Sequence, residues 1–174
     1  MPTRMGRRLG ARSPTCLARK RPPEIMPAFT QEKRIRFQHC DPAGLLFYPK
    51  AFELVGEVIE DWFLDWSGQT PHDFHKAENR SLPTVRTACE FFDQVHVSDI
   101  LTFSLLVTEI GKSSIQVTAH AIRDGKPCFA VHSTLVQVAL DSGGRYRSLP
   151  LADEVRRRLG DYSDGALTEL GASA

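Results

Sequence analysis

Residues 49–66 read PKAFELVGEVIEDWFLDW, and their apolar side chains recur at the spacing of an α-helix. Proline suits the first position of a helix, where its missing N–H needs no partner, and Gly68 suits the end. The apolar stripe is formed by Phe52, Val55, Ile59, Trp62, Phe63 and Trp66, and it is widened by Leu54, Val58 and Leu64. A helix with so wide a stripe must be covered on several sides, and this requirement decides the fold.

The segments on either side of this helix have the patterns of strands. Residues 28–38 alternate apolar Ile35 and Phe37 with polar neighbours, which predicts a half-buried strand. The polar, aperiodic stretch 69–80 predicts a loop or a short irregular helix. The rest of the chain predicts four strands at 83–97, 101–107, 114–122 and 127–140, with Asp124-Gly125 as a hairpin turn, and a short helix at 151–159.

One strand, one apolar helix and then four strands joined by short turns predict an α+β fold with an antiparallel sheet. The helix can bury its wide apolar surface only in the concave face of a curled sheet. This arrangement is the hot-dog fold, a curled antiparallel sheet of about five strands wrapped around one long apolar helix. Such a sheet keeps free edges and apolar surface, so we expect a homodimer or a homotetramer.

Residues 1–25 differ from the rest of the chain, because they hold seven basic side chains and one acid and show no apolar periodicity. The remaining residues include 15 basic and 20 acidic ones, and so acidic a body is unsuited to binding nucleic acid through its phosphates. We expect a basic, disordered extension at 1–26, one domain at 27–160 and a flexible tail at 161–174. The extension also has the composition of an organelle transit peptide. The other interpretation is a start codon assigned too early, with Met26 as the true start.

No apolar run approaches the roughly 20 residues that span a bilayer, so we expect no membrane segment. The four cysteines lie far apart and form no CxxC pair, which is typical of reduced thiols in the cytoplasm. His72 and His75 lack a third ligand at the usual spacing, so no metal site is expected.

Between the first strand and the helix, residues 39–49 read HCDPAGLLFYP. Asp41-Pro42-Ala43-Gly44 has the residues that favour a type I turn, and these four residues alone indicate no more than a turn. The helix that begins directly afterwards, at Tyr48-Pro49, and the strands that follow it favour a second role for Asp41. A rigid turn is a good mount for a catalytic carboxylate.

This stretch resembles the signature of the 4-hydroxybenzoyl-CoA thioesterase family, an Asp-Pro-Ala-Gly followed by an aromatic-Tyr-Pro at the helix start. Here the signature reads Asp41-Pro42-Ala43-Gly44 and then Phe47-Tyr48-Pro49. The match to the family signature is specific over this stretch. Over residues 28–158 the order of the strands resembles the family, but individual residues match less closely. The resemblance implies a hot-dog thioesterase that hydrolyses an acyl-CoA to a carboxylic acid and CoA. It implies no cofactor, since coenzyme A is part of the substrate.

The resemblance places the catalytic carboxylate on Asp41 and an oxyanion-binding backbone N–H on Tyr48. A helix N-terminus suits an oxyanion, because it offers unpaired N–H groups and a partial positive charge. Asp41 either attacks the carbonyl, which gives a mixed anhydride, or deprotonates water. The other residues expected at the substrate are Gly44, Pro49, Lys112, Ser113 and Ser114, with Arg147 and Arg145 as weaker candidates by position. Lys112, Ser113 and Ser114 match the strand turn at which the family binds phosphates.

Other interpretations stay open. A hot-dog hydratase or dehydratase usually needs a histidine on the helix, and this helix has none. A non-catalytic acyl-CoA-binding protein is the other alternative. The polar face of the helix is predicted at Glu53, Glu57 and Glu60, and Glu57 is a reserve candidate for a catalytic acid. His39 either tunes Asp41 or is a polar surface residue at the end of a strand. The sequence leaves aromatic, phenylacetyl-type and short aliphatic acyl groups as possible substrates.

Overall fold

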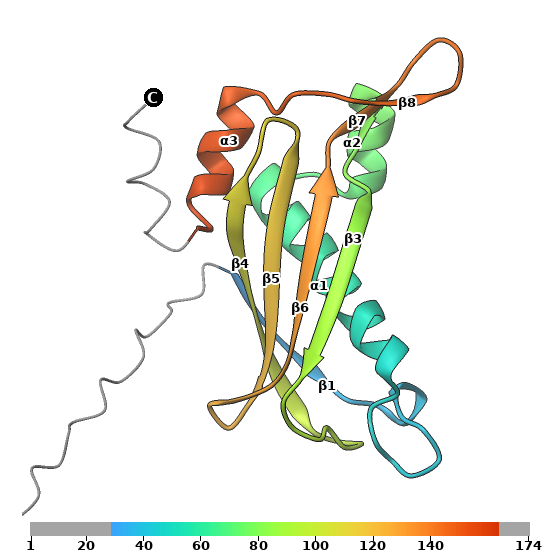
Figure 1. Cartoon of the computed structure of the whole chain (residues 1–174), viewed down its shortest axis with the longest axis vertical. Coiled ribbons are helices and arrows are strands. Elements are labelled where there is room, and N and C mark those ends of the chain that lie inside the picture. Colours follow the sequence, from blue (N-terminus) through green and yellow to red (C-terminus); the bar gives the residue numbers. More distant parts are fainter. Residues whose placement is uncertain (1–28, 164–174) are drawn as a thin grey trace, which may run out of the picture.

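The computed structural model describes residues 29–163, in which one antiparallel sheet packs against one long helix. Helix α1 (Tyr48–Ser67) lies along one face of this sheet (Figure 1). The five strands lie in the order β1 (Phe29–Arg34), β4 (Ile100–Ile110), β5 (Ser114–Arg123), β6 (Lys126–Val136) and β3 (Thr84–Phe91). The predicted α+β architecture of five antiparallel strands and one apolar helix is confirmed.

Helix α1 begins and ends where its sequence predicts. Pro49 lies in its first turn, and Gly68 follows its last residue with a left-handed backbone, φ 73°. The Gly68 N–H donates to the Leu64 carbonyl at 2.8 Å, which satisfies one of the terminal carbonyls. The side chains buried by this helix are Ala51, Leu54, Val55, Val58, Trp62, Phe63 and Trp66.

The core lies between α1 and the inner face of the sheet. Trp62 of the helix and Phe103 and Phe129 of the sheet are fully buried, and the rings of Phe103 and Phe129 meet edge to face at 5.9 Å. Complete burial of such side chains contributes roughly 1.5–3 kcal/mol each to folding. The core therefore fixes the helix on the sheet, and with it the position of the helix N-terminus.

The hairpin between β5 and β6 forms at Asp124-Gly125, as predicted. Both residues have positive φ, 51° and 75°, which matches the twist of two antiparallel strands. The register pairs Arg123 with Lys126 directly across this turn.

The stretch 69–80, for which the sequence predicts a loop or a short irregular helix, contains a regular helix, α2 (Pro71–Glu78). Thr70 caps it, because its Oγ1 accepts a hydrogen bond from the Asp73 N–H at 3.1 Å. Phe74 is its buried contact and packs on Phe63 of α1 with ring centroids 5.3 Å apart. A helix with one apolar anchor has too little periodicity for the sequence to reveal it.

Two predicted strands are shorter in the structure. The strand expected at 83–97 ends at Phe91, because the N–H groups of Phe92 and Asp93 both turn to the Cys128 carbonyl. The strand expected at 127–140 breaks at Gln137, whose buried amide donates to the carbonyls of Leu149 and Pro150. Beyond the break the chain forms a separate three-stranded sheet of β2 (Arg80–Ser81), β7 (Val138–Leu140) and β8 (Tyr146–Ser148).

The first strand is also shorter than predicted. It ends at Arg34, and a 3₁₀ turn at Phe37–His39 follows. Ile35 is buried as expected, but Phe37 is 80% exposed, so its predicted inward orientation is wrong. The tighter turn breaks the period of two that the sequence suggested.

The chain closes with α3 (Asp153–Gly160), close to the predicted 151–159. Tyr162 still packs on the body, since its ring meets Trp62 edge to face at 6.1 Å and its carbonyl accepts from the Val107 N–H.

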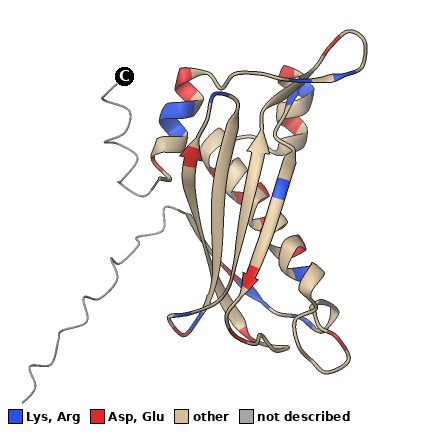
Figure 2. Ribbon diagram, in the orientation of Figure 1, with Lys and Arg blue, Asp and Glu red and all other residues tan. Residues whose placement is uncertain are grey.

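The expected extension at 1–26 and most of the expected tail lie outside the described residues. Acidic residues lie in the first turn of α3 and basic ones in its last turn, while acidic residues dominate α1 (Figure 2). Within the described part of the chain, every helix is too short or too polar to cross a membrane.

Candidate functional site

Asp41 lies at the tip of a small hairpin that leads into α1. Its carboxylate Oδ1 accepts hydrogen bonds from the N–H groups of Ala43 at 2.9 Å and Leu45 at 3.1 Å. Gly44 completes the turn with φ +80°, a backbone that side chains with a Cβ rarely adopt. Within residues 29–163, no donor contacts the other carboxylate oxygen, Oδ2. The turn therefore fixes the carboxyl group and leaves one oxygen available.

The base of the hairpin is held by backbone pairs and by a buried histidine. Cys40 pairs with Leu46, and the Phe47 N–H donates to the His39 carbonyl at 2.9 Å. The His39 Nδ1 accepts from the Arg36 N–H at 3.1 Å, and the side chain is buried, so of the two interpretations of His39 the one of a polar surface residue is wrong. Burial lowers the pKa of His39, which keeps the imidazole neutral at neutral pH.

Tyr48 is the first residue of α1, so its N–H belongs to the turn that has no acceptor within the helix. Its side chain is 62% exposed. Neither an acid in the first turn nor a side-chain cap competes for these N–H groups. Pro49 has no N–H, and the Lys50 N–H donates to the Phe47 carbonyl at 2.7 Å. The helix start at Tyr48 thus presents a main-chain donor at the surface beside the Asp41 hairpin.

The predicted phosphate-binding residues lie at the opposite end of the sheet from Asp41. Lys112 and Ser113 form the turn between β4 and β5 (Figure 1), and Ser114 opens β5. The first residues of β4 pair with Lys33 and Arg34, near the Asp41 hairpin, and an 11-residue strand is about 36 Å long. One protomer therefore does not bring these residues together with Asp41.

Arg147 lies in β8, and its Nε donates to the Asp141 carboxylate at 2.8 Å. Its side chain is mostly exposed. The guanidinium is already paired, so Arg147 is less available to a phosphate than the sequence suggested. Arg145 lies in the same loop, where its N–H donates to the Asp141 Oδ1.

The acids of α1 form its polar face, as predicted. Glu57 pairs with Lys33 at 2.8 Å, and Glu53 pairs with Lys50 at 2.6 Å. Both acids are therefore engaged at the surface. His75 of α2 contacts the Ser81 hydroxyl at 2.9 Å. Among residues 29–163, no three metal-ligating side chains come together.

Two cavities lie at the two ends of β3. The larger, of about 670 Å³, lies between α1, α2 and the start of β3, and Ile59, Phe63, Phe74 and Val85 line it together with Glu60. The smaller, of about 450 Å³, lies between the Asp41 hairpin, at Leu45 and Leu46, and the stretch from Phe91 to Val95. The cavity next to Asp41 is thus formed partly by the segment that follows β3.

Sequence reasoning missed that segment, residues 92–99, most of which it had assigned to the strand at 83–97. Val95 accepts from the Leu46 N–H, and the Val97 N–H donates to the Gly44 carbonyl. These contacts join residues about 50 positions apart in the chain, so no local pattern could reveal them.

Comparisons with known proteins identify the family of this chain and the fold that it shares. A model of the Thioesterase-like superfamily matches residues 35–159. A 1,4-dihydroxy-2-naphthoyl-CoA hydrolase from Nostoc punctiforme (strain ATCC 29133 / PCC 73102) is 28% identical over 91 residues, which are 52% of this chain and 61% of that protein. The chain thus spans less than two thirds of that relative's length.

Solved structures share the fold. A 1,4-dihydroxy-2-naphthoyl-CoA thioesterase from Synechocystis superimposes with a TM-score of 0.68 at 18% identity, over 76% of this chain and 96% of that one. A variant of 4-hydroxybenzoyl-CoA thioesterase complexed with 4-hydroxybenzoyl-CoA superimposes with a TM-score of 0.67 at 18% identity. The superposition covers 75% of this chain and 97% of that one. The family match spans the Asp41 hairpin, α1 and four of the five strands of the sheet, and the chain belongs to the Thioesterase-like superfamily.

Proposed function

We propose that this protein hydrolyses an acyl-CoA thioester to a carboxylic acid and CoA, with Asp41 as nucleophile or general base. The observation that carries the proposal is the Asp41 carboxylate, held by two backbone N–H groups with Oδ2 left available, directly ahead of the N-terminus of α1. Membership of the Thioesterase-like superfamily and the hydrolase among its relatives support this assignment.

The chemistry needs two groups. In the general-base route, Asp41 takes a proton from water, the water oxygen attacks the thioester carbonyl, and the C–S bond breaks to release the CoA thiolate. In the nucleophilic route, the Asp41 carboxylate attacks the thioester carbonyl, the C–S bond breaks to release the CoA thiolate and leave a mixed anhydride, and water then hydrolyses that anhydride to the carboxylic acid and free Asp41. Both routes place negative charge on the carbonyl oxygen, which the Tyr48 N–H at the helix start stabilises. Gly44 and Pro49 shape this site through the turn and the helix start.

We further propose that the active form is a homodimer, or a homotetramer built from that dimer, joined through the free edge of β3. This strand is the last of the sheet, and seven of its eight residues are exposed. Val85 is 60% exposed and Phe91 49% exposed, although both face the helix side of the sheet. An exposed, partly apolar edge strand is a ready template for pairing with another chain.

A two-fold antiparallel pairing centred on Ala88 suits this edge. It places Arg86 opposite Glu90 of the partner subunit on the outer face, and Val85 opposite Phe91 of the partner subunit on the inner face. Each pair occurs twice because the interface is symmetric. Opposite charges and apolar pairs across neighbouring strands both stabilise a sheet.

This pairing also completes the site. It brings the Val85 end of one β3, which lines the 670 Å³ cavity, next to the partner's Phe91 end, which borders the Asp41 hairpin. The large apolar cavity of one subunit would then hold the acyl group that Asp41 of the partner subunit cleaves. Lys112, Ser113 and Ser114 would reach the CoA phosphates across the same interface, and Arg147 would join them only by exchanging its Asp141 partner for a phosphate.

The direct test is CoA release from a panel of aromatic and aliphatic acyl-CoAs, measured for the wild type and for Asp41→Asn. Rapid thiol release by the wild type and its loss in the variant are expected. Full activity of the variant would exclude Asp41 from both roles, and binding without thiol release on every acyl-CoA would favour a non-catalytic acyl-CoA-binding protein.

A further inference from the structure

The Asp41 hairpin depends on a neighbouring segment, residues 93–99, for its position. The Leu46 N–H donates to the Val95 carbonyl at 2.8 Å, and the Val97 N–H donates to the Gly44 carbonyl at 3.0 Å. Leu45 and His96 form a β-bridge between these two bonds. The segment thus lies along the returning arm of the hairpin like an added strand, and a movement of the segment would move the hairpin.

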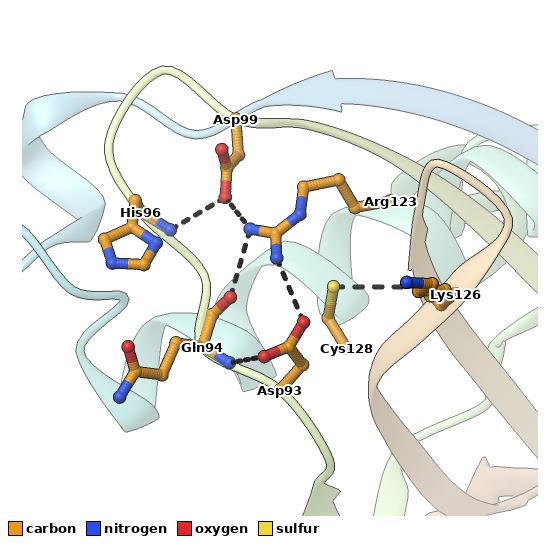
Figure 3. A network of polar contacts seen from close by, with 7 residues as sticks. All are labelled: Asp93, Gln94, His96, Asp99, Arg123, Lys126 and Cys128. Atoms are coloured by element: carbon orange, nitrogen blue, oxygen red, sulfur yellow. Dashed lines mark hydrogen bonds and ion pairs between the residues drawn. The ribbon is translucent and has the colours of Figure 1, made fainter.

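The segment has little regular structure of its own, and one arginine from a different strand holds it. Arg123, the last residue of β5, reaches three acceptors with its guanidinium (Figure 3). It donates to the Asp93 carboxylate at 3.0 Å, to the Gln94 carbonyl at 3.1 Å and to the Asp99 carboxylate. The guanidinium therefore joins the beginning of the segment to its end.

Asp99 extends this network to the other arm of the hairpin. Its Oδ2 accepts from the His96 N–H at 2.9 Å, next to the bridge with Leu45. Its carbonyl accepts from the Ile35 N–H at 2.8 Å, and the Ser98 N–H donates to the Ile35 carbonyl at 2.8 Å. Ile35 is fully buried and leads into the turn before Asp41. Both arms of the hairpin are thus tied to the segment that Arg123 holds.

Burial raises the pKa of Asp99, but the His96 N–H and the Arg123 guanidinium outweigh it and hold that pKa below its usual value. Asp99 is therefore ionised at neutral pH, and its pair with Arg123 is charge-assisted. Lysine could take over only part of this role, because a single ammonium lacks the planar fork that reaches acceptors on both sides.

We propose that Arg123 is a positioning residue for the reaction. It touches neither substrate nor the reacting atoms, but it fixes residues 93–99 and, through them, the place of the Asp41 carboxylate relative to the N-terminus of α1. The same segment forms one wall of the 450 Å³ cavity beside the hairpin, so Arg123 also sets the width of that cavity. This inference rests on the proposed role of Asp41.

The test compares Arg123→Met and Arg123→Lys with the wild type, and uses Arg157→Met as a matched control. Arg157 pairs with Glu154 on the exposed surface of α3, away from the Asp41 hairpin. The readouts are kcat and KM for an acyl-CoA, and hydrogen exchange of the peptides that cover residues 41–47 and 93–99. We expect faster exchange in both peptides of Arg123→Met while core strands stay protected, and a fall in kcat of about tenfold or more, because small misplacements of catalytic groups are costly.

Arg123→Lys should recover part of the protection and part of kcat, whereas a change confined to overall stability would affect all peptides alike. Unchanged exchange over 41–47 in Arg123→Met would overturn the proposal, and so would an equal loss of kcat in Arg157→Met. If Arg123→Met does not fold, Asp99→Asn replaces it, because this variant removes one carboxylate oxygen that accepts from Arg123. The readout is again hydrogen exchange of the peptides that cover residues 41–47 and 93–99. The exchange result does not depend on turnover: an inactive wild type would refute the thioesterase assignment, and exchange would still show whether Arg123 holds the hairpin.

Discussion

Asp41 and Asp141 form the same turn in two different parts of the chain. In each, the carboxylate Oδ1 accepts from the N–H groups two and four residues later, and a glycine with positive φ stands at the third position after the aspartate. The two differ in their second oxygen: Arg147 donates to the Asp141 Oδ2 at 2.8 Å, whereas no donor among residues 29–163 contacts the Asp41 Oδ2. The turn itself is therefore not a mark of catalysis, but its available oxygen and its place before α1 distinguish Asp41.

This likeness supplies a matched pair of variants. Asp41→Asn and Asp141→Asn change the same atoms in the same kind of turn, so their effects on the turn itself should be alike, while Asp141→Asn also weakens the pair with Arg147. We expect kcat to fall about 100-fold or more in Asp41→Asn, the usual loss when a general base is removed, and to stay near the wild-type value in Asp141→Asn. Steady-state thiol release measures kcat of both variants. Equal losses of kcat in the two variants would show that the loss in Asp41→Asn does not come from a catalytic role of its carboxylate.

Gly44→Ala should destabilise the protein by about 1–2 kcal/mol, because an L side chain is strained at φ +80°. A Cβ there would only touch Val97 at 3.9 Å, so the cost comes from the backbone. Gly56→Ala is the control with the opposite sign: Gly56 lies within α1, where an added Cβ would meet open space, and alanine in a helix interior is favoured by about 0.5–1 kcal/mol. Urea unfolding of the three proteins checks both signs.

The proposed β3 interface predicts a charge-swap result. Arg86→Glu would place like charges opposite each other twice in the dimer, so we expect dissociation at low protein concentration. Combining Arg86→Glu with Glu90→Arg restores opposite charges and should restore the dimer. Light scattering coupled to gel filtration measures the mass of each variant, and a dimer that persists in Arg86→Glu but is lost in the double variant would exclude this register.

Asp99 predicts part of the response to acid. Its pKa in the folded protein lies below the ordinary value of 3.8, so its stabilisation is complete above that value and is lost as the pH falls through the lower, folded-state pKa. Asp99→Asn should therefore lower the free energy of unfolding at pH 7 by about 1.5–3 kcal/mol, the range for hydrogen bonds to charged groups, and by less at pH 3. Urea unfolding at the two pH values gives this difference, and an equal loss at both would show that the charge of Asp99 plays no part.

Much of the site could be predicted from the sequence because it is local. The turn at Asp41 and Gly44 and the helix start at Tyr48 and Pro49 lie within nine residues of one another, and each follows from the backbone preference of its own residues. The regularity of the helix α2, for which the sequence offers only a loop or a short irregular helix, escaped prediction because α2 buries a single side chain, Phe74. The position of Phe37 escaped because a 3₁₀ turn interrupted an alternation that looked regular.

The sequence by itself determined the helix, the sheet and the turn that carries Asp41, since a wide apolar stripe, alternating strands and turn-forming residues act over short distances. Only the tertiary structure decided which oxygen of Asp41 is available and which residues hold its hairpin. Arg123 reaches Asp99 and Asp93 across 24 and 30 positions of the chain, and such pairs form only when the sheet has placed β5 beside the loop that follows β3. The physical reason is that hydrogen bonds depend on distance and angle, and between remote residues these are set by the packing of the whole sheet on α1.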